Sequence, residues 1–90
     1  MNQEQIRVRE GAAVWREVDG ETVLLALDSS MYLGVNRTGT ALWPLMVEGT
    51  TRGELVDRLA SRYDIDARRA AMDVDAFVAA CRDQRLLLVP

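Results

Sequence analysis

The first third of the chain carries alternating apolar and polar positions, the pattern of strands with one buried face. Residues 13–18 alternate weakly and end at Asp19-Gly20, a dipeptide that favours the two-residue turn of a β-hairpin. Residues 21–27 return with the largely apolar run Thr-Val-Leu-Leu-Ala-Leu. We therefore predict an antiparallel hairpin made of residues 13–18 and 21–27.

A third strand is predicted directly after this hairpin. Asp28-Ser29-Ser30 is a polar turn, and the apolar stretch 31–35 follows it. Three strands in this order form an antiparallel meander, whose last strand tends to lie at an edge. The unpaired N–H and C=O groups of an edge strand can pair with an incoming peptide. We place the candidate functional edge at residues 31–35.

The rest of the chain is predicted to be helical. A first helix should end at Gly49, with Thr38 or Thr40 as its N-cap. Pro44 fits only the first turn of a helix, so this helix either starts late or bends.

Two further helices have clear start signals. Thr51-Arg52-Gly53-Glu54 is a capping box that opens a second helix, and Asp66 is the expected N-cap of a third. Helical spacing places one apolar stripe on the third helix: Ala70, Val74, Phe77, Val78 and Cys81. The closing run 86–89 is apolar and needs a place to pack.

The predicted fold class is α+β, a three-stranded antiparallel sheet followed by three helices. The 90 residues, 49% hydrophobic and 28% charged, suit one globular domain spanning 1–90. Residues 1–10 are expected to be a flexible or weakly β tail, because only Ile6 and Val8 are apolar after the first residue.

Composition excludes several kinds of chemistry. The chain has no His and one Cys, which argues against a His/Cys metal site, an imidazole base and an internal disulfide. Cys81 lies on the apolar stripe and is interpreted as a small buried hydrophobe. Since no catalytic set is visible, we expect no enzyme, no cofactor and no metal. No secretory signal or membrane-spanning run is seen, so a cytoplasmic protein is expected.

Three helices with a small sheet are also the content of a winged-helix DNA-binding protein. Net charge is −3, and residues 64–84 hold five Asp against three Arg. A recognition helix with net negative charge contacts phosphates poorly. DNA binding is therefore kept as a minor alternative.

The order of signals resembles the PqqD-like family, the RiPP recognition elements that bind leader peptides of ribosomally made, modified natural products. The matching residues are Asp28 to Asn36, Thr38-Gly39, Leu42-Trp43, Glu48-Gly49-Thr50, Glu54-Leu55, Leu59, Tyr63-Asp64, Asp73-Val74, Phe77-Val78 and Leu86-Leu87. Two departures are Gly34-Val35, which separates Leu33 from Asn36, and Pro44. The chain looks most like the stand-alone recognition protein of lasso-peptide pathways.

This resemblance implies a winged helix-turn-helix-like domain that binds a leader peptide as a strand added to the third strand. It further implies a groove against the third helix, delivery to a cysteine-protease-type leader peptidase, and a cyclase acting afterwards. Neither nucleic acid nor membrane is an implied partner. A PqqD-type chaperone that serves a radical SAM enzyme is the alternative. The implied peptide-binding residues are Met31, Tyr32, Leu33, Gly34, Val35, Ala70, Ala71, Val74, Phe77, Val78 and Cys81.

The implied residues on the third helix form an apolar stripe, and such a stripe is expected first of all to pack in the core. Only one flank of the stripe would be free to contact a peptide. For Tyr32, core support and peptide contact are equally compatible with the sequence.

Overall fold

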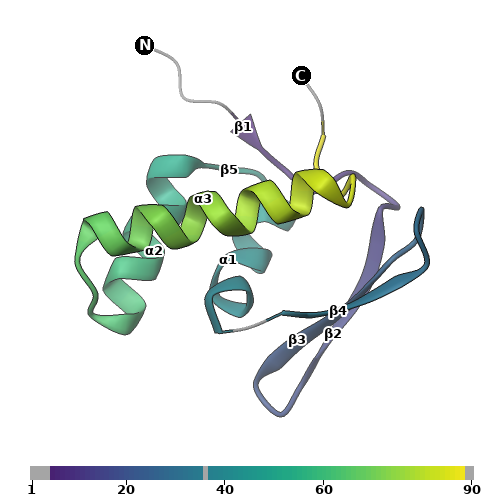
Figure 1. Ribbon diagram of the computed structural model, residues 1–90, viewed down its shortest axis with the longest axis horizontal. Helices are drawn as coiled ribbons and strands as arrows, with labels where there is room; N and C mark the ends of the chain where they lie inside the picture. The colour runs from purple at the N-terminus through teal and green to yellow at the C-terminus, as the bar shows by residue number, and fades with distance from the viewer. Residues whose placement is uncertain (1–4, 36, 89–90) are drawn as a thin grey trace.

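The computed structural model describes residues 5–35 and 37–88, and for residues 31 and 33–35 it describes the backbone alone. The described residues form a mixed α+β fold whose helices gather on one side of a meander sheet (Figure 1). In chain order the elements are β1 Gln5–Ile6, β2 Ala13–Val18, β3 Glu21–Ala26, β4 Met31–Val35, α1 Arg37–Glu48, β5 Thr50–Thr51, α2 Arg52–Tyr63 and α3 Ala67–Asp83.

The meander has the predicted strands in the order β2-β3-β4, all antiparallel. Asp19 and Gly20 have φ angles of 52° and 80°, as the two-residue turn between β2 and β3 requires. The strands lie where the hairpin and the third strand were predicted, and β3 ends one residue earlier than expected.

The sheet has one covered and one open face. Leu24 lies opposite Trp15 of β2 and Leu33 of β4, so these three positions share a face. Leu24 is buried, as are the other β3 residues of that parity, and α1 packs against this side. Because side chains alternate along a strand, the intervening positions form the opposite face, away from the helices.

Helix α1 begins earlier than predicted. It starts at Arg37, so that Thr38 and Thr40 lie inside the helix and neither is its N-cap; residue 36 is outside the described residues. Pro44 lies within the helix and does not delay its start. Burial of the neighbouring Trp43 and Met46 outweighs the donor that Pro44 lacks.

The ends of the helices follow the sequence signals. Gly49 has a φ of 100° and donates its N–H to the Leu45 carbonyl at 3.0 Å, which ends α1 as predicted. Thr51 and Glu54 form the complete capping box of α2. Asp66 accepts the Arg69 amide at 2.8 Å and caps α3.

The described part of the N-terminal segment is fixed rather than free. β1 pairs with β5, and Val8 forms an isolated antiparallel bridge with Leu87. The Val8 amide also donates to the Met46 carbonyl at 2.8 Å. Of the two expected alternatives, a flexible or a weakly β tail, residues 5–10 follow the weakly β one, because pairing with β5 and with the residues after α3 holds them. Through the same pairing, the apolar residues 86 and 87 are buried against the N-terminal segment and the core.

Most of the predicted stripe of α3 lies in the core. Ala70, Val74, Val78 and Cys81 are buried there, within the same core cluster as the α1 and α2 residues Trp43, Met46, Leu55 and Leu59. Trp43 is 1% exposed, and its ring meets Trp15 edge-on, with 5.5 Å between ring centroids. This aromatic pair joins α1 to the covered face of the sheet.

Candidate functional site

Strand β4 has one paired and one open edge. It pairs with β3 over all five of its residues, and no other described strand lies beside it. Among the strands of this sheet, β4 is the one nearest α3 (Figure 1). The open edge therefore carries backbone groups that an additional strand can use.

The alternation of the ladder identifies these groups. In a hairpin with a two-residue turn, the two residues that flank the turn form a hydrogen-bonded pair. Here these residues are Val18 and Glu21. Bonded and non-bonded pairs then alternate, which places Leu24 and Leu33 in a bonded pair between β3 and β4. Consequently the amides and carbonyls of Tyr32 and Gly34 point toward the open edge, whereas those of Leu33 serve β3.

A hollow lies where β4 leads into α1 and α1 meets α3. Its volume is about 250 Å³, about half that of the larger hollow described below, and Thr38 forms its α1 side. The α3 side is formed by four residues that follow one another at spacings of three or four and therefore lie on one side of the helix: Asp73, Ala76, Phe77 and Ala80. Small side chains at 76 and 80 leave the space open. We call the strip between the open edge of β4 and this flank the β4–α3 groove.

The groove is tied at both ends. The turn before β4 contacts the end of α3, where the Ser29 hydroxyl donates to Gln84 Oε1 at 3.3 Å. At the other end the Tyr63 hydroxyl donates to the carbonyl of Arg37, the first residue of α1, at 3.1 Å. The guanidinium of Arg37 lies 5.4 Å from the centre of the Tyr63 ring. These contacts fix where β4 starts and where it ends relative to the helices.

The predicted site residues fall into separate groups. Residues 31–35 form β4 as expected, and the ring of Tyr32 is 75% exposed on the open sheet face, so it gives no core support. Phe77 is partly buried and lines the hollow, and Ala71 is partly buried outside its lining. The remaining four are buried and have no surface to offer a peptide here: Ala70, Val74, Val78 and Cys81.

The sequence interpretation missed the other lining residues. Thr38, Asp73, Ala76 and Ala80 belong to the hollow, and none of them was a candidate for peptide contact. The available signal was the flank of α3 beside the apolar stripe, where small residues recur at helical spacing. Their meaning depends on which element packs nearby, and the helix alone does not specify that.

The charges around the groove are paired within α3 and across to α2. Asp73 meets Arg69 at 3.4 Å between carboxylate and guanidinium. Asp75 accepts two hydrogen bonds from Arg52 at 2.7 and 3.0 Å, and these lower the pKa of its carboxyl. Burial raises the pKa of the Cys81 thiol to about 12. These groups show no arrangement of nucleophile and base.

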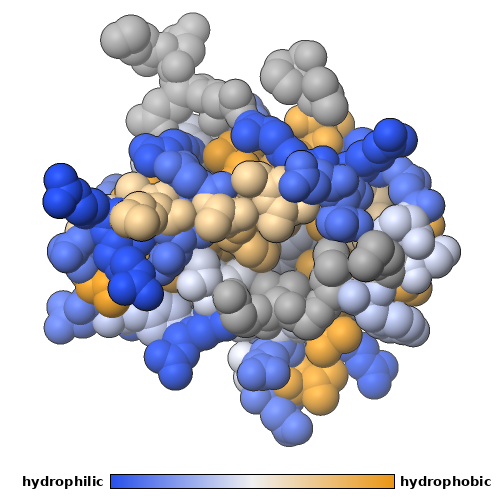
Figure 2. Space-filling view, in the orientation of Figure 1, coloured by the Kyte–Doolittle hydropathy of each residue, from blue (hydrophilic) through white to orange (hydrophobic). Residues whose placement is uncertain are grey.

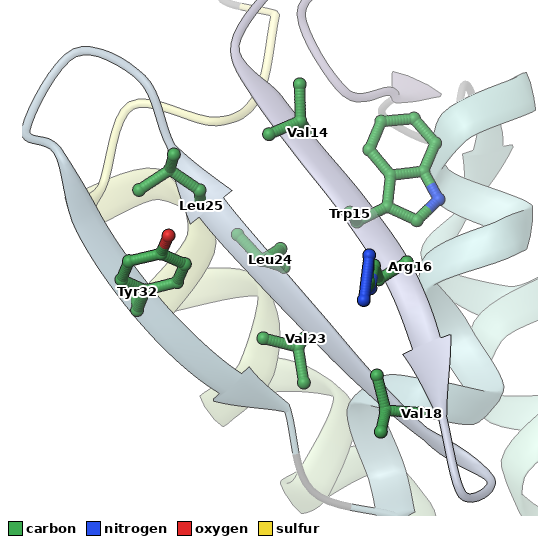
Figure 3. Close-up of a pocket in the computed structure, with 8 residues that line it drawn as sticks. All are labelled: Val14, Trp15, Arg16, Val18, Val23, Leu24, Leu25 and Tyr32. Carbon is green, nitrogen blue, oxygen red and sulfur yellow. The ribbon is translucent and has the colours of Figure 1, made fainter.

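The open face of the sheet is a second surface feature that the sequence interpretation missed. Figure 3 shows apolar side chains from all three strands standing on this face, with Arg16 among them. They surround a hollow of about 510 Å³, whose lining also includes Trp15 and Leu24 from the covered side of the sheet. The complete lining is Val14, Trp15, Arg16, Val18, Val23, Leu24, Leu25 and Tyr32. We call the exposed part, made by Val14, Arg16, Val18, Val23, Leu25 and Tyr32, the outer sheet face.

The described residues lack two further features. No group of three or more His, Cys, Asp or Glu side chains in residues 5–35 and 37–88 could hold a metal ion. Over the same part of the chain, no helix has the length and apolar character needed to cross a membrane.

Comparison with known proteins agrees with this geometry. A solved structure described as "TbiB1 in Complex with the TbiA(beta) Leader Peptide" is 30% identical, with 91% of this chain and 94% of that chain covered and a TM-score of 0.80. "Lasso peptide synthetase B1 complexed with the leader peptide" shares the fold at 23% identity, with 92% and 96% covered and a TM-score of 0.76. No curated protein matches the chain.

The family assignment comes from the sequence itself. The model of the family described as coenzyme PQQ synthesis protein D (PqqD) matches residues 21–87, from the start of β3 to the buried C-terminal run. This span includes β4, the lining of the hollow and all three helices. The chain belongs to the PqqD family, as the order of its motifs predicted.

Proposed function

We propose that this protein binds the leader region of a ribosomally made precursor peptide as an extra strand on β4. The observation that carries the proposal is the open edge of β4 beside the flank of α3 that lines the hollow. It is supported by the shared fold of TbiB1, whose structure contains the TbiA(beta) leader peptide. In this role the protein is a cytoplasmic binding module and not an enzyme, and it needs no cofactor.

An added strand suits the chemistry of the groove. Tyr32 and Gly34 each offer one amide donor and one carbonyl acceptor to the ligand backbone. Such bonds make little demand on sequence, so selectivity falls on the alternate side chains of the peptide. The hollow beside Phe77, at about 250 Å³, is smaller than the roughly 300–1,000 Å³ of typical small-molecule pockets. It suits one apolar or aromatic side chain of the leader.

We further propose that the protein delivers the bound leader to a separate leader peptidase of the cysteine-protease type, and that a cyclase acts afterwards. The outer sheet face supports it, because none of the described helices covers this apolar surface and Val14 and Tyr32 are 55% and 75% exposed on it. A strand added to β4 extends the same face. An enzyme that docks there would meet the sheet and the peptide together.

A second candidate is presentation of the precursor to a radical SAM enzyme. The matching family model, which is that of a coenzyme PQQ synthesis protein, favours this reading. The two candidates share leader binding on β4 and differ in the enzyme served. Co-purification with the peptidase or with the radical SAM enzyme encoded nearby separates them.

The first experiment is a titration of the protein with a fluorescent leader peptide from a neighbouring precursor gene, at low and at high salt. We expect saturable binding that changes little with salt, because backbone pairing releases few counterions. Binding of duplex DNA that weakens steeply with salt would instead support the winged-helix alternative. Absence of binding to every neighbouring leader would contradict the proposed function.

A further inference from the structure

We propose that Arg9 is a positioning residue that holds the two walls of the β4–α3 groove at a fixed separation. The inference rests on the proposed function, because the groove is the site at which that function places the leader. Arg9 lies outside the groove lining and would act through the residues that it fastens.

One guanidinium joins both walls. Arg9 Nη2 donates to Asp28 Oδ2 at 2.7 Å, and Asp28 belongs to the turn that leads into β4. Arg9 Nε and Nη2 also donate to the Arg85 carbonyl at 3.0 and 2.7 Å, and Arg85 follows the end of α3. Arg9 therefore connects the start of one wall to the end of the other.

Arg9 is itself held in place. Its backbone amide donates to the Leu86 carbonyl at 2.7 Å, next to the bridge between Val8 and Leu87. Its acceptor on the α3 side is equally fixed, since Arg85 has a φ of 58° and donates its amide to the Arg82 carbonyl at 2.9 Å. A left-handed residue at this point directs the chain back from the helix.

The opposite end of the groove has its own tether, the bond from the Tyr63 hydroxyl to the Arg37 carbonyl. With both ends fixed, the space beside Phe77 and Ala80 is shaped before a peptide arrives. A site that is organised in advance loses less freedom on binding, and its affinity is higher for that reason. Loosening the Arg9 end should therefore weaken leader binding without removing any residue that touches the leader.

The chain offers a matched control for this test. Arg52 forms a two-bond ion pair with Asp75 at 2.7 and 3.0 Å, and it joins α2 to α3 at residues that do not line the hollow. Arg9→Met and Arg52→Met each remove one surface Arg–Asp pair. Arg9→Lys keeps a positive charge near Asp28 but loses the planar fork that also reaches Arg85.

Leader affinity should fall roughly tenfold in Arg9→Met, the equivalent of one charge-assisted hydrogen bond. Arg9→Lys should restore part of this loss, and Arg52→Met should bind like the parent chain. Equal affinities in Arg9→Met and the parent chain, or equal losses in Arg9→Met and Arg52→Met, would overturn the proposal. Failure of the unaltered protein to bind any leader would instead contradict the proposed function.

A measurement without leader tests the same claim directly. Spin labels on Tyr32→Cys and Ala79→Cys report the distance across the groove, while the buried Cys81 is shielded from labelling. The distance distribution should broaden or shift when Arg9→Met is added, and it should not change with Arg52→Met. An unchanged distribution in the Arg9→Met background would overturn the proposed positioning role.

Discussion

At the scale of single residues, Cys81 shows how the fold decides chemistry. The side chain lies on the face of α3 that is buried in the core, and burial raises the pKa of its thiol from 9.0 to about 12. A thiol that stays protonated at neutral pH is a poor nucleophile. Its role is therefore packing, in agreement with the interpretation from sequence.

The raised pKa makes a prediction about stability at high pH. The unfolded thiol ionises from about pH 9, whereas the folded one does not until about pH 12. The free energy of unfolding should therefore fall between these values by up to about 1.4 kcal/mol per pH unit from this group. Urea unfolding of the parent chain and of Cys81→Ala measures the difference. Identical pH slopes in the two proteins would contradict it.

The α3 stripe marks the limit of prediction at this scale. Helical spacing correctly grouped Val74, Val78 and Cys81, because that spacing is a local property of the chain. It could not say that these residues face inward while Asp73 and Ala80 face the groove. That division depends on where the sheet and α1 pack against the helix, which local sequence does not encode.

At the scale of elements, α3 serves the core with one stripe and the groove with the adjacent flank. Figure 2 shows that the surface of α3 that faces the viewer is weakly hydrophobic and bordered by hydrophilic side chains. Ala76 and Ala80 are exposed members of the flank, and Ala79 is an exposed alanine that does not line the hollow. The helix thus provides both a test position and its control.

Filling the hollow should block the leader. Ala80→Leu places a large side chain in the space, and overpacking against the peptide should weaken its binding roughly tenfold or more. Ala79→Leu makes the same chemical change outside the hollow and should leave affinity unchanged. Both variants should fold, because leucine is a good helix former at exposed positions. Fluorescence titration compares them, and equal affinities would show that the leader does not occupy this space.

The open edge of β4 has its own test. Tyr32→Pro removes an amide that points away from β3, so the sheet should survive while the leader loses a hydrogen bond and meets the proline ring. Leader affinity should fall roughly tenfold relative to Tyr32→Ala, which loses the same aromatic ring but keeps the amide. A Tyr32→Pro variant that folds and binds as well as Tyr32→Ala would rule out strand addition at this position.

Among the elements, those with local signals were predictable. The hairpin depends on Asp19-Gly20, and the starts of α2 and α3 depend on Thr51 and Asp66, all of which act within a few residues. The β1–β5 pair was not predicted, because its two short strands lie far apart in sequence. The start of α1 was misplaced because Thr38 and Thr40, which suggested an N-cap, both lie inside the helix.

At the scale of the whole molecule, two surfaces meet along one sheet. The edge of β4 is proposed to take the leader, and the outer sheet face continues from it across β3 and β2 (Figure 3). Binding and delivery can then be separated by mutation, because they use different sides of the same strands.

Val14→Asp tests this separation. A charge at this exposed position of the outer sheet face should leave leader affinity unchanged and slow leader removal by the peptidase, by roughly tenfold if Val14 lies within the contact. Met72→Asp is the control, since Met72 is another exposed apolar residue, on α3 outside both hollows. A peptidase assay with saturating leader measures both variants. Equal cleavage rates would place the enzyme's docking surface elsewhere.

The most direct test of the central claim is amide hydrogen exchange, resolved residue by residue in β4 with and without a bound leader peptide. The Tyr32 and Gly34 amides should exchange readily in the free protein and become protected when the leader is bound. The Leu33 amide, which serves β3, should be protected in both states. Binding of the leader without new protection at Tyr32 and Gly34 would contradict strand addition to β4.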